Sequence, residues 1–548
     1  MFSLHDILGS KPDHPMFDLK EAKRLLAELP YNDPLKALDG VTTWLTSVKD
    51  ATGFRPELHA NVIMLLDDTG QPFCARLLKK YLAAPHLQDF QGMHLWRAIH
   101  DFMVALAEAY TVCAQEYQHA EKHPPHYREQ MPLICVRSLR AVAEQIKLSL
   151  MRYLDVEPAI WQQMYQLYDF AKANHLANVA VIANAVEGIL VTPQKELLRA
   201  LVLHISSPAT LAPDHIEAVH HIAIHLVNLF EFKETWEPDC TYFVDLALPE
   251  APRPVYEELQ STPTMRFFGA VKALPEIQDI IQQHEQIPPG QDHHVISEFT
   301  PEGKLTVLKH LRTYWKRTRP QRHHERMDIM TAIDIVHGFN AIGQVVTRID
   351  LGKLLNLSEE DAAMLQQRTE ASLDPDSVAR IRETWDVMNV SNAGLGGVLP
   401  KSAEWVKIGD LCGIKANGRD TWWVGTIRRL KADAHGHIHF GMEILARKPL
   451  SVWLRTLGTD QGKRVELMPN WESSSGSFTY DYLPALLLPD AQNAYLDATL
   501  LLESGKFVMS RIHEVMVGEQ SRTIKLTALL AEGDDYEQAA LEWIDPVH

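Results

Sequence analysis

The spacing of the apolar residues changes partway along this chain, and this change limits the folds open to it. Up to about residue 230, apolar residues recur every three or four positions, for example over Leu19–Leu29, Leu58–Leu66 and Ala98–Tyr117, which is the period of an amphipathic helix. Beyond about residue 300, short strand-like blocks predominate. A helical part followed by a β part is therefore expected in a chain long enough for roughly three or four domains.

The helical part shows recognisable starts and breaks. Asp33 directly before Pro34 suits a helix start, because proline fits the first helical position. Turn-forming residues at positions 68–70 predict a break, and further helices are expected over residues 180–190 and 215–229. The sequence has no clean fixed-period repeat, so we expect either an all-α bundle or a short solenoid.

Turn signals divide the chain into four parts. We predict an all-helical region at residues 1–234, a mixed segment at 235–300, a β-barrel region at 301–450 and a second β module at 451–548. The mixed segment carries a strand pattern at residues 241–246. The strands predicted in the two β regions are 328–336, 385–390, 394–399, 410–415, 422–430 and 437–445, then 495–502, 507–517 and 522–530.

Charge and cysteine content narrow the classes of protein. The formal net charge is -18, which argues against a nucleic-acid coat or a protein that binds anionic membranes. Five cysteines without a C-x-x-C pair indicate reduced thiols. The N-terminus lacks a signal-peptide pattern, and no apolar run approaches the ~18 residues that span a bilayer. We expect a soluble cytoplasmic protein without membrane insertion.

One segment departs from the acidic composition. Residues 312–326 hold six Lys or Arg side chains and one Glu. A solvated basic helix end would explain such a run by itself. Within it, however, Arg322 and Arg326 form an R-x-x-x-R pattern directly before a predicted strand.

A second pattern follows downstream. Asn389, Ser391 and Gly394 fit [D/N]-x-S-x-x-G. The two patterns, in this order, resemble the PilZ family, whose members are small antiparallel barrels that bind the bacterial second messenger cyclic di-GMP. Residues 423–430 resemble the family's G-x-h-R-R strand, and residues 439–445 resemble its closing strand.

The resemblance covers about residues 315–450, with one departure from the family pattern. About sixty residues separate Arg326 from Asn389, where the family usually has a few tens. We interpret residues 340–382, which look helical, as an insertion between the first two strands. The expected fold is then a helical region, a PilZ-like barrel with a helical insertion, and a C-terminal β module.

The resemblance implies a cyclic di-GMP site formed by Arg322, Arg326, Asn389, Ser391 and Gly394. The residue types suit this ligand. Arginine binds phosphate as a two-pronged fork, pairs with guanine O6 and N7, or stacks on a purine. An asparagine amide offers a donor and an acceptor to a base edge, a serine offers a hydroxyl, and glycine admits close backbone approach. Additional basic contacts are predicted at Arg317 and Arg319.

The implied function is a receptor that couples nucleotide binding to an N-terminal helical region, which would hold a protein partner. We expect no catalytic residues and no cofactor beyond this ligand, because the sequence lacks a P-loop, a dinucleotide fingerprint, a G-x-S-x-G motif and the paired acidic motifs of enzymes that make or degrade the messenger. The partners would not include a nucleic acid polymer.

Two alternatives stay open. In the first, the PilZ-like barrel no longer binds a nucleotide and the protein is a scaffold that acts through its helices. In the second, the protein is a metal enzyme that uses the histidines on one predicted helix. A packed or surface histidine helix is favoured over a metal site, since no H-E-x-x-H motif is present. These histidines are His215, His220, His221 and His225.

Overall fold

In the computed structural model the chain forms two compact units. The division falls between residues 321 and 322, with residues 431–433 grouped with the first unit. The predicted boundaries at residues 234, 300 and 450 stay predictions. The structure describes residues 14–83, 90–120, 124–183, 188–286, 301–318, 320, 325–354, 382–403, 405–416, 418, 421–433, 435–457, 482–489, 498–517 and 520–544.

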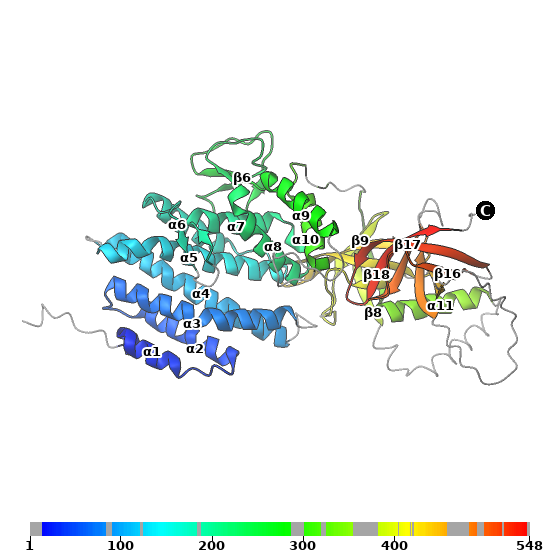
Figure 1. Ribbon diagram of the computed structural model, residues 1–548, viewed down its shortest axis with the longest axis horizontal. Helices are drawn as coiled ribbons and strands as arrows, with labels where there is room; N and C mark the ends of the chain where they lie inside the picture. The colour runs from blue at the N-terminus through cyan, green and yellow to red at the C-terminus, as the bar shows by residue number, and fades with distance from the viewer. Residues whose placement is uncertain are drawn as a thin grey trace, which may run out of the picture. The chain divides into compact units, whose positions relative to one another are not determined.

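The first unit consists mainly of helices, coloured blue to green in Figure 1. Helix α2 starts as predicted, because the Asp33 side chain accepts a hydrogen bond from the backbone N–H of Lys36 and Pro34 takes the first helical position. The helices are α1 (Leu19–Ala27), α2 (Pro34–Asp50), α3 (Pro56–Leu82), α4 (Phe90–His119), α5 (Pro125–Met151), α6 (Pro158–Ala173), α7 (Pro193–Ile205), α8 (Pro213–Leu226), α9 (Leu274–Gln286) and α10 (Pro301–Tyr314).

The break predicted at residues 68–70 is wrong, because α3 runs through these positions. A Cβ atom on Gly70 would lie 2.4 Å from the ring of Phe102 on α4, so the missing side chain lets the two helices pack closely. Asp67 beside it is buried and accepts a hydrogen bond of 2.7 Å from Tyr110, also on α4. Aspartate and glycine, which are common in turns, here form part of the contact between α3 and α4.

The helix predicted at residues 180–190 is also wrong. Strands β1 (Val181–Ile182) and β2 (Leu190–Val191) form a short antiparallel ladder there, and Gly188 takes a left-handed φ of 63°. The strand predicted at 241–246 is confirmed by β4 (Tyr242–Asp245). This strand belongs to a sheet of order β3-β6-β4-β5, whose other members are β3 (Glu231–Lys233), β5 (Arg253–Pro254) and β6 (Met265–Gly269).

One apolar cluster joins the elements of the first unit. It extends from Met16 to Trp315 and includes side chains of the small sheet, α9 and α10. Trp315 is buried, and its indole N–H donates a hydrogen bond of 2.8 Å to the Ser206 hydroxyl after α7. The segments beyond residue 234 therefore pack on the same core as the earlier helices.

The second unit contains, among its described residues, two closed antiparallel barrels of six strands each, which confirms the predicted fold class. In both barrels the strands neighbour one another in the order first, second, third, sixth, fifth, fourth, and the fourth closes on the first. The first barrel is made of β7 (Met327–His337), β8 (Arg382–Val390), β9 (Gly394–Val398), β10 (Leu411–Ala416), β11 (Trp423–Ala432) and β12 (Ile438–Ala446). The second is made of β13 (Leu450–Thr456), β14 (Tyr482–Leu488), β15 (Thr499–Glu503), β16 (Ile512–Val517), β17 (Gln520–Glu532) and β18 (Tyr536–Trp543).

The predicted helical insertion starts with α11 (Phe339–Leu354), which follows β7 in the chain. The remainder of the predicted insertion, residues 355–381, lies outside the described residues. The backbone N–H of Phe339 donates to the carboxylate of Asp535 at 2.5 Å, a contact that ties the start of α11 to the second barrel. Apolar residues of α11 and of both barrels share one buried cluster: Val336, Phe339, Ile342, Val346, Leu411, Trp422, Val424, Ala446, Leu486, Leu488, Leu501 and Tyr536.

Candidate functional site

A β-bulge turns Asn389 toward the outer face of the first barrel. The register of β8 against β9 shifts at Met388, so that Asn389 pairs with Gly396. Gly397, the next residue on β9, points inward, since a Cβ there would lie 3.0 Å from the ring of the buried Phe440. Successive strand residues face opposite sides, so Gly396 and its partner Asn389 face outward.

Arg326 and Asn389 converge above Gly396. A Cβ atom on this glycine would lie 3.0 Å from Oδ1 of Asn389 and 3.4 Å from Nη1 of Arg326. Asn389 Oδ1 is buried and has no hydrogen-bond partner within the described part of the chain. A buried acceptor without a partner costs free energy, so its presence beside an arginine marks a place where a donor from a ligand would fit.

A second glycine extends this surface. Gly441 on β12 pairs with Gly396, and a Cβ on Gly441 would lie 3.4 Å from the Cβ of Arg429 on β11. One row across four strands therefore runs from Asn389 over two glycines to Arg429. Arg429 was not among the predicted site residues, although it lies in the segment that resembles the family's G-x-h-R-R strand.

Ser391 and Gly394 form the turn that follows Asn389. The Ser391 hydroxyl donates to the carbonyl of Gly394 at 3.2 Å and accepts from its N–H at 3.1 Å. A Cβ on Gly394 would lie 2.4 Å from the carbonyl oxygen of Met442, so only glycine fits where β9 approaches β12. The structure thus shows these two residues closing the turn next to Asn389.

The remaining predicted residues do not join this group. Arg322 and Arg319 lie outside the described residues. Arg317 belongs to the first unit, where its guanidinium donates a hydrogen bond of 2.5 Å to Asp239. The structure therefore brings together Arg326 and Asn389, with Ser391 and Gly394 in the adjoining turn.

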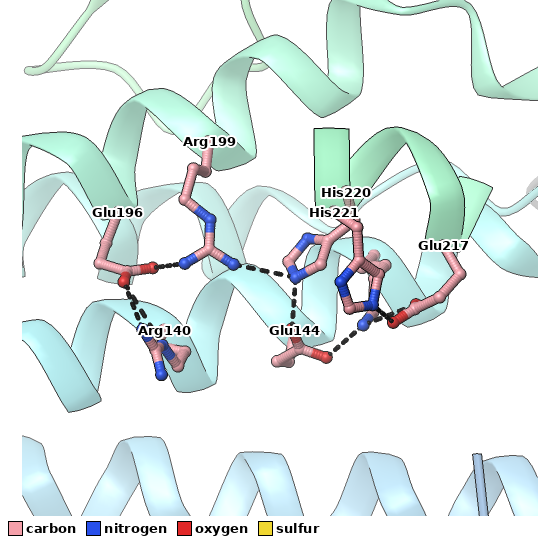
Figure 2. A network of polar contacts seen from close by, with 8 residues as sticks. Arg140, Glu144, Glu196, Arg199, Glu217, His220 and His221 are labelled. Atoms are coloured by element: carbon pink, nitrogen blue, oxygen red, sulfur yellow. Dashed lines mark hydrogen bonds and ion pairs between the residues drawn. The ribbon is translucent and has the colours of Figure 1, made fainter. Parts of the chain in front are cut away.

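The histidine-rich helix α8 belongs to a different polar cluster, which Figure 2 shows. His220 is buried, and its Nε2 accepts a hydrogen bond of 2.9 Å from Arg199 and lies 3.2 Å from Glu144. His221 lies 3.2 Å from Glu217. The packed-helix interpretation is confirmed for His220.

The charges in this cluster are paired with one another. Buried Lys147 lies 2.7 Å from Glu144 and 2.8 Å from Glu217. Burial alone would raise the pKa of Glu217, but Lys147 lowers it to about 2. Burial, aided by Lys147, lowers the pKa of His220 to about 4, so this ring is neutral at neutral pH. We assign this cluster a structural role, joining α5, α7 and α8. Its other ion pairs are Arg140–Glu196 and Arg199–Glu196.

Comparison with known proteins identifies two parts of the chain. A family model described as the cyclic-di-GMP receptor FimW, N-terminal domain, matches residues 20–238. A second model, described as the FimW C-terminal beta-barrel domain, matches residues 473–544. No curated protein and no solved structure matches the chain. The barrel that carries Arg326 and Asn389 lies between the two matched ranges.

These descriptions name a receptor, and the family they define is not one of enzymes. Helices with the length and apolar character needed to cross a bilayer are absent from the described residues.

Proposed function

We propose, because the chain belongs to the FimW family of cyclic-di-GMP receptors, that it binds cyclic di-GMP on the outer face of its first barrel. The convergence of Arg326 and Asn389 above Gly396 carries this proposal. Ser391 and Gly394 hold the turn beside them, and Arg322 would approach from the segment before β7. Arg429 bounds the same row of residues on the opposite side.

The chemistry of the row matches a guanine nucleotide. Oδ1 of Asn389 can accept a hydrogen bond from a guanine N–H, and Arg326 can donate to O6 and N7 or to a phosphate. Gly396 is buried beneath Asn389 and Arg326 and leaves room for these two side chains to converge. The half-buried Gly441 leaves backbone beside them that a flat purine can approach closely. Arg429 would offer a second cation to the other phosphate.

Binding would act on the segment that leads into β7. In this proposal the ligand binds Arg322 and Arg326 together with the barrel, and this contact changes how the first unit presents its helices to a protein partner in the cytoplasm. A ligand shifts such an equilibrium only as far as it binds one state better than the other.

Calorimetric titration of the full chain with cyclic di-GMP tests the site. We expect wild type to bind, and Arg326→Ala to bind at least about tenfold more weakly, because a hydrogen bond to a charged group contributes about 1.5–3 kcal/mol. The matched control is Arg382→Ala, which removes an exposed arginine of the same barrel that pairs with Asp334 on β7. This control should bind as wild type does.

Cyclic di-AMP separates base recognition from phosphate binding, because it has the same two phosphates and lacks the guanine edge. Asn389→Ala should lower the preference for cyclic di-GMP over cyclic di-AMP. Equal binding of cyclic di-GMP by wild type and Arg326→Ala would refute the site. If wild type does not bind at all, the receptor proposal fails, and the non-binding scaffold becomes the better interpretation.

A further inference from the structure

Exposed methionines gather beside the proposed ligand site. Met330 is 91% exposed, Met327 67% and Met388 42%, and all three lie on the neighbouring strands β7 and β8. Among the described residues, the one other methionine with a strongly exposed side chain is Met509, between β15 and β16. Side chains of this kind seldom cluster on a surface that contacts only water.

Irregularities in both strands place Met330 and Met388 at the same point of the β7–β8 pair. The register of β7 against β8 shifts between Asp328 and Thr331, which leaves Ile329 and Met330 opposite Met388 outside the regular ladder. Met388 is also the residue at which β8 shifts against β9. Asn389 follows Met388 directly and pairs with Asp328, so the methionines adjoin the ligand site.

The charged residues among them are three carboxylates and Arg326, which already belongs to the proposed ligand site. Glu325, Asp328 and Asp386 are all exposed on the same two strands or directly before them. Carboxylates repel phosphate, so this surface suits neither nucleic acid nor an anionic membrane. Its charge is complementary to a basic partner.

The form of the partner follows from the barrel. The barrel is closed, so β7 and β8 have neighbours on both sides and offer no free edge to an added strand. A helix laid across the strands can bury its apolar face, and flexible methionine side chains adapt to such a face.

We propose that this acidic methionine surface, formed by Met330, Met388, Glu325, Asp328 and Asp386, binds a basic amphipathic helix of a partner protein, and that cyclic di-GMP strengthens the binding. The second part rests on the proposed function. Two ligand phosphates would add negative charge next to the surface, so a basic helix binds the ligand-loaded form more tightly. By thermodynamic linkage, the helix also strengthens ligand binding.

Fluorescence anisotropy with the full chain tests the surface. The probes are two labelled peptides of about five helical turns, one built from leucine and lysine and the other from leucine and glutamate in the same order. The variant is Met330→Thr with Met388→Thr, since threonine suits strands and removes the apolar contact. Met509→Thr is the matched control, because it removes an exposed methionine elsewhere in the same unit.

We expect the lysine peptide to bind at least about tenfold more tightly than the glutamate peptide, and cyclic di-GMP to increase its affinity further. The double variant should lose about tenfold in affinity for the lysine peptide. Met330→Thr alone, which keeps the bulge residue Met388, should bind cyclic di-GMP as wild type does, and Met509→Thr should change neither affinity. The whole chain carries a charge of -18, so preference for lysine alone does not locate the site.

Equal binding of the lysine peptide by wild type and the double variant would refute the proposal that this surface binds a basic helix. If calorimetry shows no cyclic di-GMP binding, the proposed function and the strengthening by ligand fail. The methionine dependence measured without nucleotide still decides whether the surface binds a basic helix.

Discussion

The two barrels have the same strand order. The outer face of the second and third strands, however, is polar in the first barrel and buried against protein in the second. In the first barrel, strands β8, β9, β12 and β11 present Asn389, two glycines and Arg429 in one outward row. In the second, the corresponding strands β14 and β15 present Leu486 and Leu501, which are buried in the cluster shared with α11. We expect the first face to receive a ligand, whereas the second packs against protein.

This difference shows that strand topology leaves the use of a face undecided. A row of glycines between an amide and arginines cannot bury apolar area, whereas leucines on both sides of a strand can bury area both inside and outside a barrel. Leu487 points into the second barrel while Leu486 and Leu488 point into the shared cluster. Only the first barrel is therefore expected to bind nucleotide.

The largest expected effect comes from the covered face. Leu501→Ala should destabilise the second unit by about 2–5 kcal/mol, because it opens a cavity in a fully buried cluster. Leu530→Ala on β17 is the control, since that side chain is 52% exposed and should change stability by less than about 0.5 kcal/mol. Denaturant unfolding of both variants measures the difference, and a cost for Leu501→Ala as small as that of the control would mean that the face is not a packing surface.

The pattern of apolar residues predicts the strands of the first barrel, and the resemblance to the PilZ family implies that they form a barrel. The pattern at 422–430 became β11 (Trp423–Ala432), and that at 437–445 became β12 (Ile438–Ala446). Strand β14 (Tyr482–Leu488) was not predicted. Its Leu486-Leu487-Leu488 run does not alternate, because both faces of this strand are buried. Burial by a neighbouring domain thus removes the signal on which strand prediction depends.

The site could be predicted only in part. Asn389, Ser391 and Gly394 lie within one local pattern, and the structure places them at one strand end and its turn. The bulge at Met388 that turns Asn389 outward depends on pairing with β9, which a local pattern does not contain. Arg429 lies beside Gly441 because β11 neighbours β12 in the barrel. Its position could therefore be assigned only once the fold was known.

A smaller effect is expected where the two barrels meet. Asp410 precedes β10 and accepts a hydrogen bond of 2.7 Å from the backbone N–H of Lys407. Asp534 and Asp535, from the turn between β17 and β18, repel its charged form. Burial, together with these two aspartates, raises the pKa of Asp410 to about 7.

This shift makes the junction sensitive to pH. Between about pH 4 and pH 7 the folded protein keeps a proton on Asp410 that the unfolded chain has lost, so stability falls as pH rises through that window, by at most about 4 kcal/mol. Asp410→Asn cannot titrate and still accepts from Lys407. Unfolding at pH 5 and pH 8 should show a smaller loss for the variant, and an unchanged loss would contradict the role of Asp410.

The smallest expected change in stability is on the open face. In Gly396→Ala the new Cβ would lie 3.0 Å from Asn389 Oδ1, 3.2 Å from the backbone oxygen of Phe440 and 3.4 Å from Arg326 Nη1. The two side-chain ends can move by a few tenths of an ångström and the backbone oxygen must give slightly, so we expect only a small loss of stability. The methyl group nevertheless displaces Asn389 and Arg326, the two side chains that would hold the ligand.

Calorimetry of Gly396→Ala should show at least about tenfold weaker binding of cyclic di-GMP, equal to about 1.4 kcal/mol. Gly343→Ala is the control, because nothing lies within 4 Å of its added Cβ on α11 and alanine favours the helix. It should bind as wild type does. Full affinity in Gly396→Ala would show that this glycine, like Gly394, only lets neighbouring strands approach closely. The two barrels would then differ in their polar side chains alone.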